Sequence, residues 1–236
     1  MSAAKRLAAY WDWPAGAEVP DARIVVCSSG LLTAAMLHKG SPLDDGVPAR
    51  AVTALSDATT GEGEAWAVVP EIPPMLTLMA QSHPPRRIIP ALHVARQADL
   101  ARLPDLLAVM AERRAFVVSP EEAIDLYAPI DGMPSPRPLL DAVFIVGMDK
   151  PVRPDWVRSV VEQCRKAGVP VVLVTWGEWM PAAHLAERYP NDHVGARFEH
   201  GEWFWRVGAE RSGAMLDGQP IEDVPEWLEP LDARPS

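Results

Sequence analysis

The feature that most constrains the fold is a set of six short apolar runs, many of them rich in valine and isoleucine. Each run is almost continuously hydrophobic, which is typical of strands buried on both faces, as in a parallel sheet. Helical segments separate several of them, with spacings that fit βα units joined by right-handed crossovers. The runs are "RIVVCSS" (23–29), "AWAVVP" (65–70), "RIIPALHV" (87–94), "AFVVS" (115–119), "AVFIVG" (142–147) and "VPVVLVTW" (169–176).

The clearest helix signal lies between the last two runs, in "RPDWVRSVVEQCRKAGV". Gly168 stands where a helix C-terminal stop belongs. Further helices are expected in "PPMLTLMAQSH" and "QADLARLPDLLAVMAERR". The pattern therefore predicts an α/β protein with about six parallel strands. One face of the clearest helix is apolar at helical spacing and consists of Trp156, Val157, Val160, Val161 and Cys164.

Six βα units are too few to close an eight-stranded barrel, so a partial or degenerate barrel and an open doubly wound sheet are the choices. After residue 180 the alternation stops, and a polar segment leads into a hairpin formed by "EWFWRVG" and "GAMLDG". We predict an α/β domain over residues 1–180, a polar segment and hairpin packed on the same domain over 181–228, and a tail over 229–236.

Charge and cysteine content exclude several classes of protein. The net charge of −10 over 236 residues argues against a general nucleic-acid binder. No apolar run is long enough to span a bilayer and no signal-peptide core is present, so a cytoplasmic protein without membrane insertion is expected. Cys27 and Cys164 are far apart in the sequence. We expect both to be unpaired thiols, because thiols stay reduced in the cytoplasm, and a disulfide is the alternative. Two cysteines cannot hold an iron–sulfur cluster unaided.

Two blocks toward the C-terminus resemble a phage and prophage family of unknown function. They are "WVRSVVEQCRKAGVPVVLVTWGEW" and "HGEWFWRVGAERSGAMLDGQPIEDVP". The family pattern is W-V-R, Q-C, A-G-V-P and K-Q-W-G-E-W, followed by a W-x-x-V-G…G-x-x-L-D-G hairpin. Upstream, "ALHVARQADLARLPDLL" is similar to the family's G-V-S-V-E-N-Q segment. Full-length members look like radical-SAM proteins, so the resemblance implies a partial or degenerate TIM-type (β/α) barrel with a C-terminal β-hairpin extension.

The chain departs from that family where the chemistry resides. Radical-SAM enzymes hold a [4Fe–4S] cluster on a C-x-x-x-C-x-x-C loop, and no such loop occurs here. The family's G-G-E-S-G reads "VGMDK" (146–150), Ala95 replaces the glutamate of G-V-S-V-E, and the E-P pair reads "SPEE" (119–122). Val174 and Thr175 occupy the K-Q positions. Each of these changes removes a polar group from the carboxyl end of a strand, where barrel active sites lie. We therefore expect neither radical chemistry nor an iron–sulfur cluster.

Polar residues at the predicted strand ends are the candidate ligand contacts. Asp149, Lys150 and Arg153 follow one apolar run, and His93 lies near the end of another. The alternative for His93 is a hydrogen-bonded core residue. The histidines show no H-x-x-x-H or H-E-x-x-H spacing, so no metal site is predicted.

The motif W-G-E-W contains two further candidates, Trp176 and Glu178. In a functional interpretation, Glu178 is a site carboxylate at the mouth of a strand. In a structural interpretation, it accepts hydrogen bonds from backbone N–H groups while both tryptophans pack. We favour the structural interpretation and keep both residues as candidate ligand contacts.

These observations predict a phage-encoded binding protein on a degenerate radical-SAM-like scaffold, with a host or phage protein as its partner and no catalytic residue. A small molecule is the second kind of partner considered. The alternative function is a cluster-free enzyme that binds a nucleotide or SAM-like ligand at the mouth of the strands. A third reading is an inactive subunit that assembles with a full-length homologue.

Overall fold

The computed structural model describes residues 6–11, 22–27, 66–70, 87–129, 139–184 and 195–228. The chain forms two compact units. The first comprises Met1–Val94 and Ala98–Val117, and the second comprises Ala95–Gln97 and Val118–Ser236.

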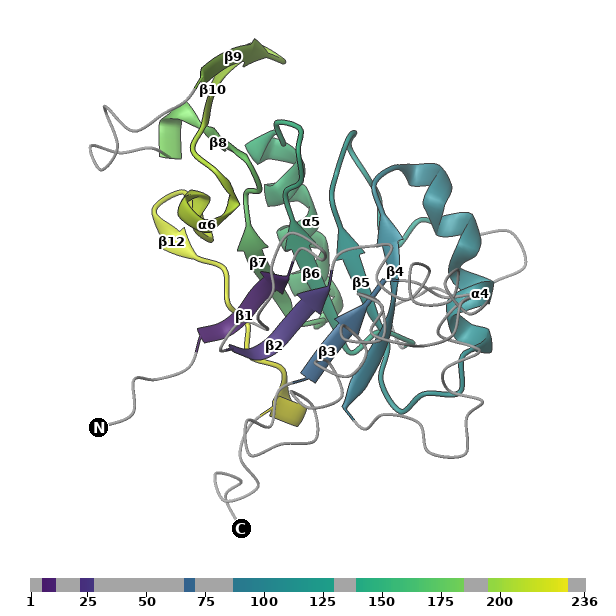
Figure 1. Ribbon diagram of the computed structural model, residues 1–236. Helices are drawn as coiled ribbons and strands as arrows, with labels where there is room; N and C mark the ends of the chain where they lie inside the picture. Colours follow the sequence, from purple (N-terminus) through teal and green to yellow (C-terminus); the bar gives the residue numbers. More distant parts are fainter. Residues whose placement is uncertain are drawn as a thin grey trace, which may run out of the picture. The chain divides into compact units, whose positions relative to one another are not determined.

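The first unit is built on strands that follow one another in chain order, from β1 to β5. Three successive pairs, β1–β2, β2–β3 and β3–β4, are parallel. The 3₁₀ turn η2 (Gln97–Arg102) and the short helix α4 (Leu103–Ala108) precede β5, and α4 packs against β4 (Figure 1). The strands are β1 (Arg6–Trp11), β2 (Ala22–Cys27), β3 (Trp66–Val69), β4 (Ile88–Val94) and β5 (Ala115–Val118).

The strand order of this unit bears on the choice of architecture. Each strand pairs with its predecessor, whereas a doubly wound sheet reverses direction at a switch point. A singly wound order is that of a barrel wall. The prediction of an α/β protein with parallel strands is confirmed, and the order agrees with a partial barrel.

All six apolar runs form strands, and most of the described side chains in each strand are buried. The sequence prediction missed β1, whose residues "RLAAYW" contain neither valine nor isoleucine. The helix expected in "QADLARLPDLLAVMAERR" is shorter than predicted, because it divides into η2 and α4 with Pro104 in the first turn of α4. The helix expected in "PPMLTLMAQSH" lies outside the described residues.

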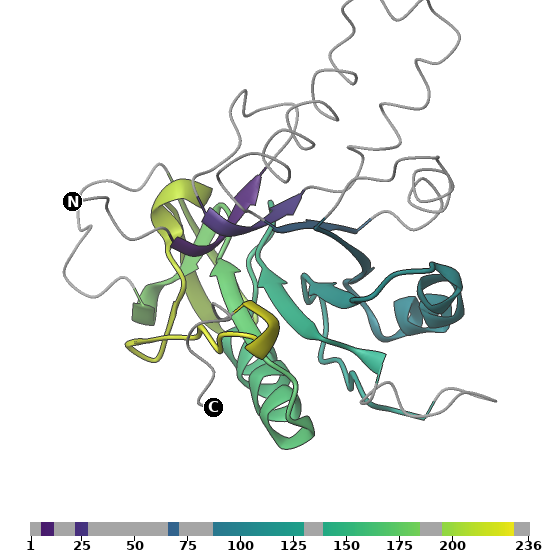
Figure 2. The ribbon, with the colours of Figure 1, turned by 90° about the horizontal axis from the view of Figure 1, so that it is seen from below.

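The second unit contains the parallel pair β6 (Ala142–Val146) and β7 (Val171–Thr175), connected through helix α5 (Pro154–Ala167). Figures 1 and 2 show α5 lying beside these strands, and it packs against β7. Gly168 ends the helix in the left-handed conformation, as predicted. The predicted apolar face is buried at Val157, Val160, Val161 and Cys164, while Trp156 is only half-buried.

The prediction of one hairpin from "EWFWRVG" and "GAMLDG" is wrong, because these segments do not pair with each other. Strand β10 (Glu202–Arg206) lies between β8 (Trp179–Pro181) and β9 (Gly195–Glu199) in an antiparallel sheet. The second segment forms its own small hairpin, β11 (Met215–Leu216) with β12 (Gln219–Pro220). Turns with positive φ at His200–Gly201 and Asp217–Gly218 fix the two hairpins separately.

Shorter elements complete the second unit. Helix α6 (Ala209–Ser212) separates the two hairpins, and the 3₁₀ turns η4 (Ala182–His184) and η5 (Glu226–Leu228) lie on either side of them in the chain. Residues 229–236, the predicted tail, lie outside the described part. The predicted division at residue 180 stays a prediction.

Cys27 and Cys164 are both buried thiols, as expected. Burial raises the pKa of the Cys164 thiol to about 12, which keeps it protonated at neutral pH. No helix in the described ranges is long and apolar enough to cross a membrane.

Candidate functional site

Three charged side chains that follow successive strands meet in the second unit, and we call them the strand-end cluster: Arg96, Glu121 and Lys150. They follow β4, β5 and β6, respectively. One carboxylate oxygen of Glu121 accepts hydrogen bonds from Arg96 at 2.6 and 2.9 Å. The other accepts a hydrogen bond from Lys150 at 2.7 Å. The cluster is therefore a single carboxylate that bridges two cations.

The carboxylate of the strand-end cluster is stabilised in its ionised form. Hydrogen bonds from Lys150 and then from Arg96 lower the pKa of Glu121. Both cations are largely exposed, at 60% for Lys150 and 63% for Arg96, and Glu121 is 31% exposed. A carboxylate with a lowered pKa is a poor proton donor near neutral pH. This geometry suits recognition of a charged partner better than acid–base catalysis.

Backbone hydrogen bonds position Glu121. Its N–H donates to the carbonyl of Ala95 at 2.9 Å. Gln97 donates its N–H to Glu122 at 2.7 Å, and its amide side chain exchanges two hydrogen bonds with the backbone of Asp125. These contacts join residues 95–97 to residues 121–125, so that Arg96 and Glu121 face each other in a defined register.

Ser119 adds a buried polar group near the cluster in the chain. It is 6% exposed, and its hydroxyl oxygen has no hydrogen-bond partner among the described residues. Buried hydroxyls in proteins normally have a partner. A ligand or a bound water at this strand end would supply one.

The first half of the W-G-E-W motif, Trp176 and Gly177, is buried and closely packed. Trp176 is 1% exposed, and its indole N–H donates to the carbonyl of Met215 at 2.9 Å. A side chain at Gly177 would lie 2.3 Å from the carbonyl oxygen of Met148, and one at Gly147 would lie 2.0 Å from that of Trp176. The two backbones therefore approach so closely that glycine is required at both positions.

The second half of the motif is more exposed. The Glu178 carboxylate forms an ion pair with Arg206, while its carbonyl accepts the N–H of Val207 at 3.0 Å. The indole N–H of Trp179 donates to the carbonyl of Asp149 at 2.9 Å. The guanidinium of Arg197 lies 5.4 Å from the centre of the Trp179 ring, within the range of a cation–π contact.

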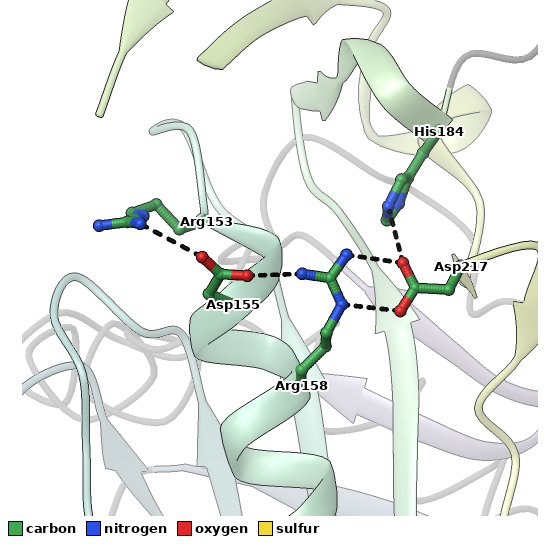
Figure 3. Close-up of polar contacts among 5 residues, drawn as sticks. All are labelled: Arg153, Asp155, Arg158, His184 and Asp217. Carbon is green, nitrogen blue, oxygen red and sulfur yellow. Dashed lines mark hydrogen bonds and ion pairs between the residues drawn. The ribbon is translucent and has the colours of Figure 1, made fainter. Parts of the chain in front are cut away.

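A second ion network, the α5 network, joins the start of α5 to the turn of the β11–β12 hairpin (Figure 3). Arg158 donates two hydrogen bonds of 2.7 Å to Asp217 and one of 2.6 Å to Asp155. Arg153 donates to the other oxygen of Asp155 at 3.3 Å. The pKa of Asp217 is lowered, and that of Arg158 is raised, chiefly by their mutual hydrogen bonds.

His184 forms the buried end of the α5 network. Its Nε2 lies 3.6 Å from Asp217, and its ring stands edge-on to Trp176 at 5.1 Å. The side chain is only 6% exposed. Burial lowers the pKa of His184, so the ring is neutral at pH 7.

The structure brings together only some of the residues predicted as ligand contacts. Lys150 joins Glu121, Arg153 joins the α5 network, and Asp149 contacts Trp179 through its backbone carbonyl while its side chain is exposed. His93 is half-buried on β4 in the first unit, whereas Trp176 and Glu178 belong to the second.

Sequence reasoning did not select Arg96, Glu121, Arg158 or Asp217. The position of Glu121 in "SPEE", directly after an apolar run, was the available signal for the cluster. No group of three or more metal-ligating residues occurs within the described ranges. Glu187, Asp192 and His193, from the polar segment before β9, lie outside those ranges.

Comparison with protein families gives a match to a family model. Residues 76–225 match the model of a family described as a protein of unknown function, DUF5131. No curated protein matches the sequence, and no solved structure matches it either. The match includes the strand-end cluster, the W-G-E-W motif and the α5 network.

Proposed function

We propose a binding function without catalysis for this chain, which belongs to the DUF5131 family because the family model covers well over half of its length. The partner we propose is a host or phage protein. We propose that the protein is phage-encoded and cytoplasmic. Its fold would be a partial TIM-type barrel that derives from a radical-SAM-like ancestor. The resemblance of the W-G-E-W and L-D-G blocks supports this origin.

The observation that carries the proposal is the pairing of Glu121 with two exposed cations. A general acid or base requires a pKa near the working pH, whereas the pKa of Glu121 is lowered from an already acidic value. Within the strand-end cluster, the two cations outnumber the one carboxylate. An acidic side chain of a partner protein would approach Arg96 and Lys150 from the solvent side.

Electrostatic recognition of this kind affects the choice of partner and the association rate more strongly than it affects the affinity. We therefore expect partner binding to weaken as salt is raised, because exposed charges are screened over about 8 Å at physiological ionic strength. The absence of a C-x-x-x-C-x-x-C loop supports a role that does not depend on an iron–sulfur cluster.

The test compares two lysines of equal charge. Lys150→Glu reverses a cation of the cluster, and Lys166→Glu reverses an exposed cation in the last turn of α5. Proteins retained from host lysate by the wild-type chain are identified, purified and titrated against all three forms. We expect the dissociation constant to rise at least about tenfold for Lys150→Glu and to stay unchanged for Lys166→Glu. Equal affinities of both variants for every retained protein would refute the proposal.

A second function, binding of a nucleotide or SAM-like small molecule, rests on the buried hydroxyl of Ser119. Ser119→Ala removes a buried hydroxyl that has no partner within the described residues, so its stability should match or exceed that of the wild type. Isothermal titration with SAM and with ATP then separates the two forms. Binding to the wild type that is lost in Ser119→Ala favours the small-molecule function, and no heat from either ligand argues against it.

A further inference from the structure

Within the part of the chain that the structure describes, the antiparallel sheet of the second unit ends in β9, a strand with one open side. The strand order is β8–β10–β9, so within the described residues β9 pairs only with β10. Its central residues Ala196, Arg197 and Phe198 are exposed. Such an edge presents unpaired backbone groups that another strand can bind.

The turn between β9 and β10 determines which backbone groups face outward. His200 and Gly201 form a two-residue loop with φ of 54° and 84°, as in a type I′ turn. Glu199 and Glu202 close this loop as a hydrogen-bonded pair, so the next pair outward, Phe198 with Trp203, is not hydrogen-bonded. The N–H and C=O of Phe198 therefore point away from β10.

The charges of β9 are arranged symmetrically about Phe198. Arg197 and Glu199 flank it and share one face of the strand, where they form an ion pair of 3.1 Å. If two copies of β9 run antiparallel with Phe198 on the two-fold axis, Arg197 of each copy lies opposite Glu199 of the other. A shift that centres Arg197 on the axis would instead oppose two arginines. Directly opposed charges of opposite sign stabilise a strand pair, and like charges destabilise it.

The other face of the strand carries aromatic side chains. Phe198 is 58% exposed and Trp203 is 53% exposed, and their rings lie 5.3 Å apart. The ring of Trp205 is nearly parallel to that of Trp203, with centres 6.4 Å apart. In the symmetric arrangement, the two Phe198 side chains become neighbours and the aromatic rows of both copies join.

We propose that β9 pairs with β9 of a second copy of this chain, antiparallel and with Phe198 on the two-fold axis. The central hydrogen bonds run from each Phe198 N–H to the Phe198 carbonyl of the other copy. Two ion pairs between Arg197 and Glu199 flank them. The strand is only five residues long, so the interface is small and the dimer is expected to be concentration-dependent. The proposal does not depend on the strand-end cluster.

Charge reversal tests both the contact and its register by sedimentation velocity. Arg197→Glu places two glutamates opposite each other, and Glu199→Arg places two arginines opposite each other. Each single variant should therefore associate at least about tenfold more weakly than the wild type. The double variant Arg197→Glu/Glu199→Arg should associate like the wild type. An equimolar mixture of the two single variants should form a heterodimer.

Glu162→Arg and Lys166→Glu provide matched controls, because both change the charge of exposed residues on α5. Both should dimerise like the wild type, and circular dichroism should show the same fold for every variant. A wild-type chain that sediments as a single copy up to roughly millimolar concentration would overturn the proposal. So would single variants that dimerise normally, or a mixture of the two that does not associate.

Discussion

The Trp176–Trp179 loop and the strand-end cluster both lie at carboxyl ends of strands, but they are held in different ways. In the loop, Trp176 is 1% exposed and two glycines allow backbone contacts that no other residue would permit. In the cluster, three charged side chains that are 31% to 63% exposed hold one another by hydrogen bonds. The loop is fixed by packing, and the cluster by charge.

The residues whose identity the fold restricts most are therefore not the residues that are most exposed to a partner. The W-G-E-W sequence is conspicuous because close backbone approach and a buried indole restrict the residues that can occupy it. The cluster is inconspicuous because its contacts join residues that are 25 and 29 positions apart in the chain. The strand-end cluster is accessible to a partner, but its residues form no motif that stands out in the sequence.

The largest expected effect is that of Gly177→Ala, which tests whether the loop is fixed by packing. Gly177 has a φ of 75°, and a Cβ there would lie 2.4 Å from the carbonyl carbon of Gly147. We expect the free energy of unfolding to fall by more than about 4 kcal/mol, or folding to fail. Gly168→Ala is the control, because its φ is 70° but nothing lies within 4 Å. It should lose only about 1–2 kcal/mol, the cost of the left-handed conformation. Equal losses in urea denaturation would contradict the close approach.

A smaller effect distinguishes the two tryptophans of the loop. Trp176→Ala removes a fully buried indole and should lower the free energy of unfolding by about 3–5 kcal/mol. Trp179→Ala removes a half-buried ring and its contact with Arg197, and should cost about 1–2 kcal/mol. Chemical denaturation of both variants measures the difference. If Trp179→Ala cost more than Trp176→Ala, the packing role would belong to the exposed half of the motif.

The strands could be predicted because burial on both faces leaves a direct trace in the sequence, as in "AVFIV" and "VVLVT". The same holds for α5, whose apolar face and terminal glycine are local signals. Strand β1 lacks that trace. The hairpin was predicted incorrectly because both turns, at His200–Gly201 and Asp217–Gly218, satisfy the same local rule. The choice of strand partner then depends on the pairing of β10 with β8, two strands that are far apart in the sequence.

The candidate site could be predicted only in part, for a related reason. Lys150 was selected because it follows a strand, but its partner Glu121 is 29 residues away in the chain. Asp217 and Arg158 are separated by 59 residues, and nothing local to either predicts their bidentate pair. Long-range ion pairs depend on the fold, so they emerge only when the elements are placed in space.

A pH series should sharpen the comparison, because His184 packs against Trp176 on the loop side. Burial lowers its pKa below the ordinary value of 6.5. The unfolded chain therefore binds a proton first as pH falls below 6.5, and the folded state loses stability in that range. His184→Gln should abolish this loss, which is at most about 1.4 kcal/mol per pH unit for one proton. Unfolding measured between pH 7.5 and 5.5 provides the test, and parallel pH profiles for both proteins would contradict it.

The smallest effect on stability is expected for Glu121→Gln. The pKa of Glu121 is lowered, so its ion pairs stabilise the fold at pH values above 4.5 and lose that effect as pH falls through the folded-state pKa. Exposed pairs contribute little, so the variant should lose less than about 1 kcal/mol at pH 7, and the difference should vanish in acid and shrink in high salt. If partner binding is nevertheless lost, Glu121 serves recognition and not folding. A loss comparable to that of Trp176→Ala would mean that the cluster, like the loop, is part of the architecture.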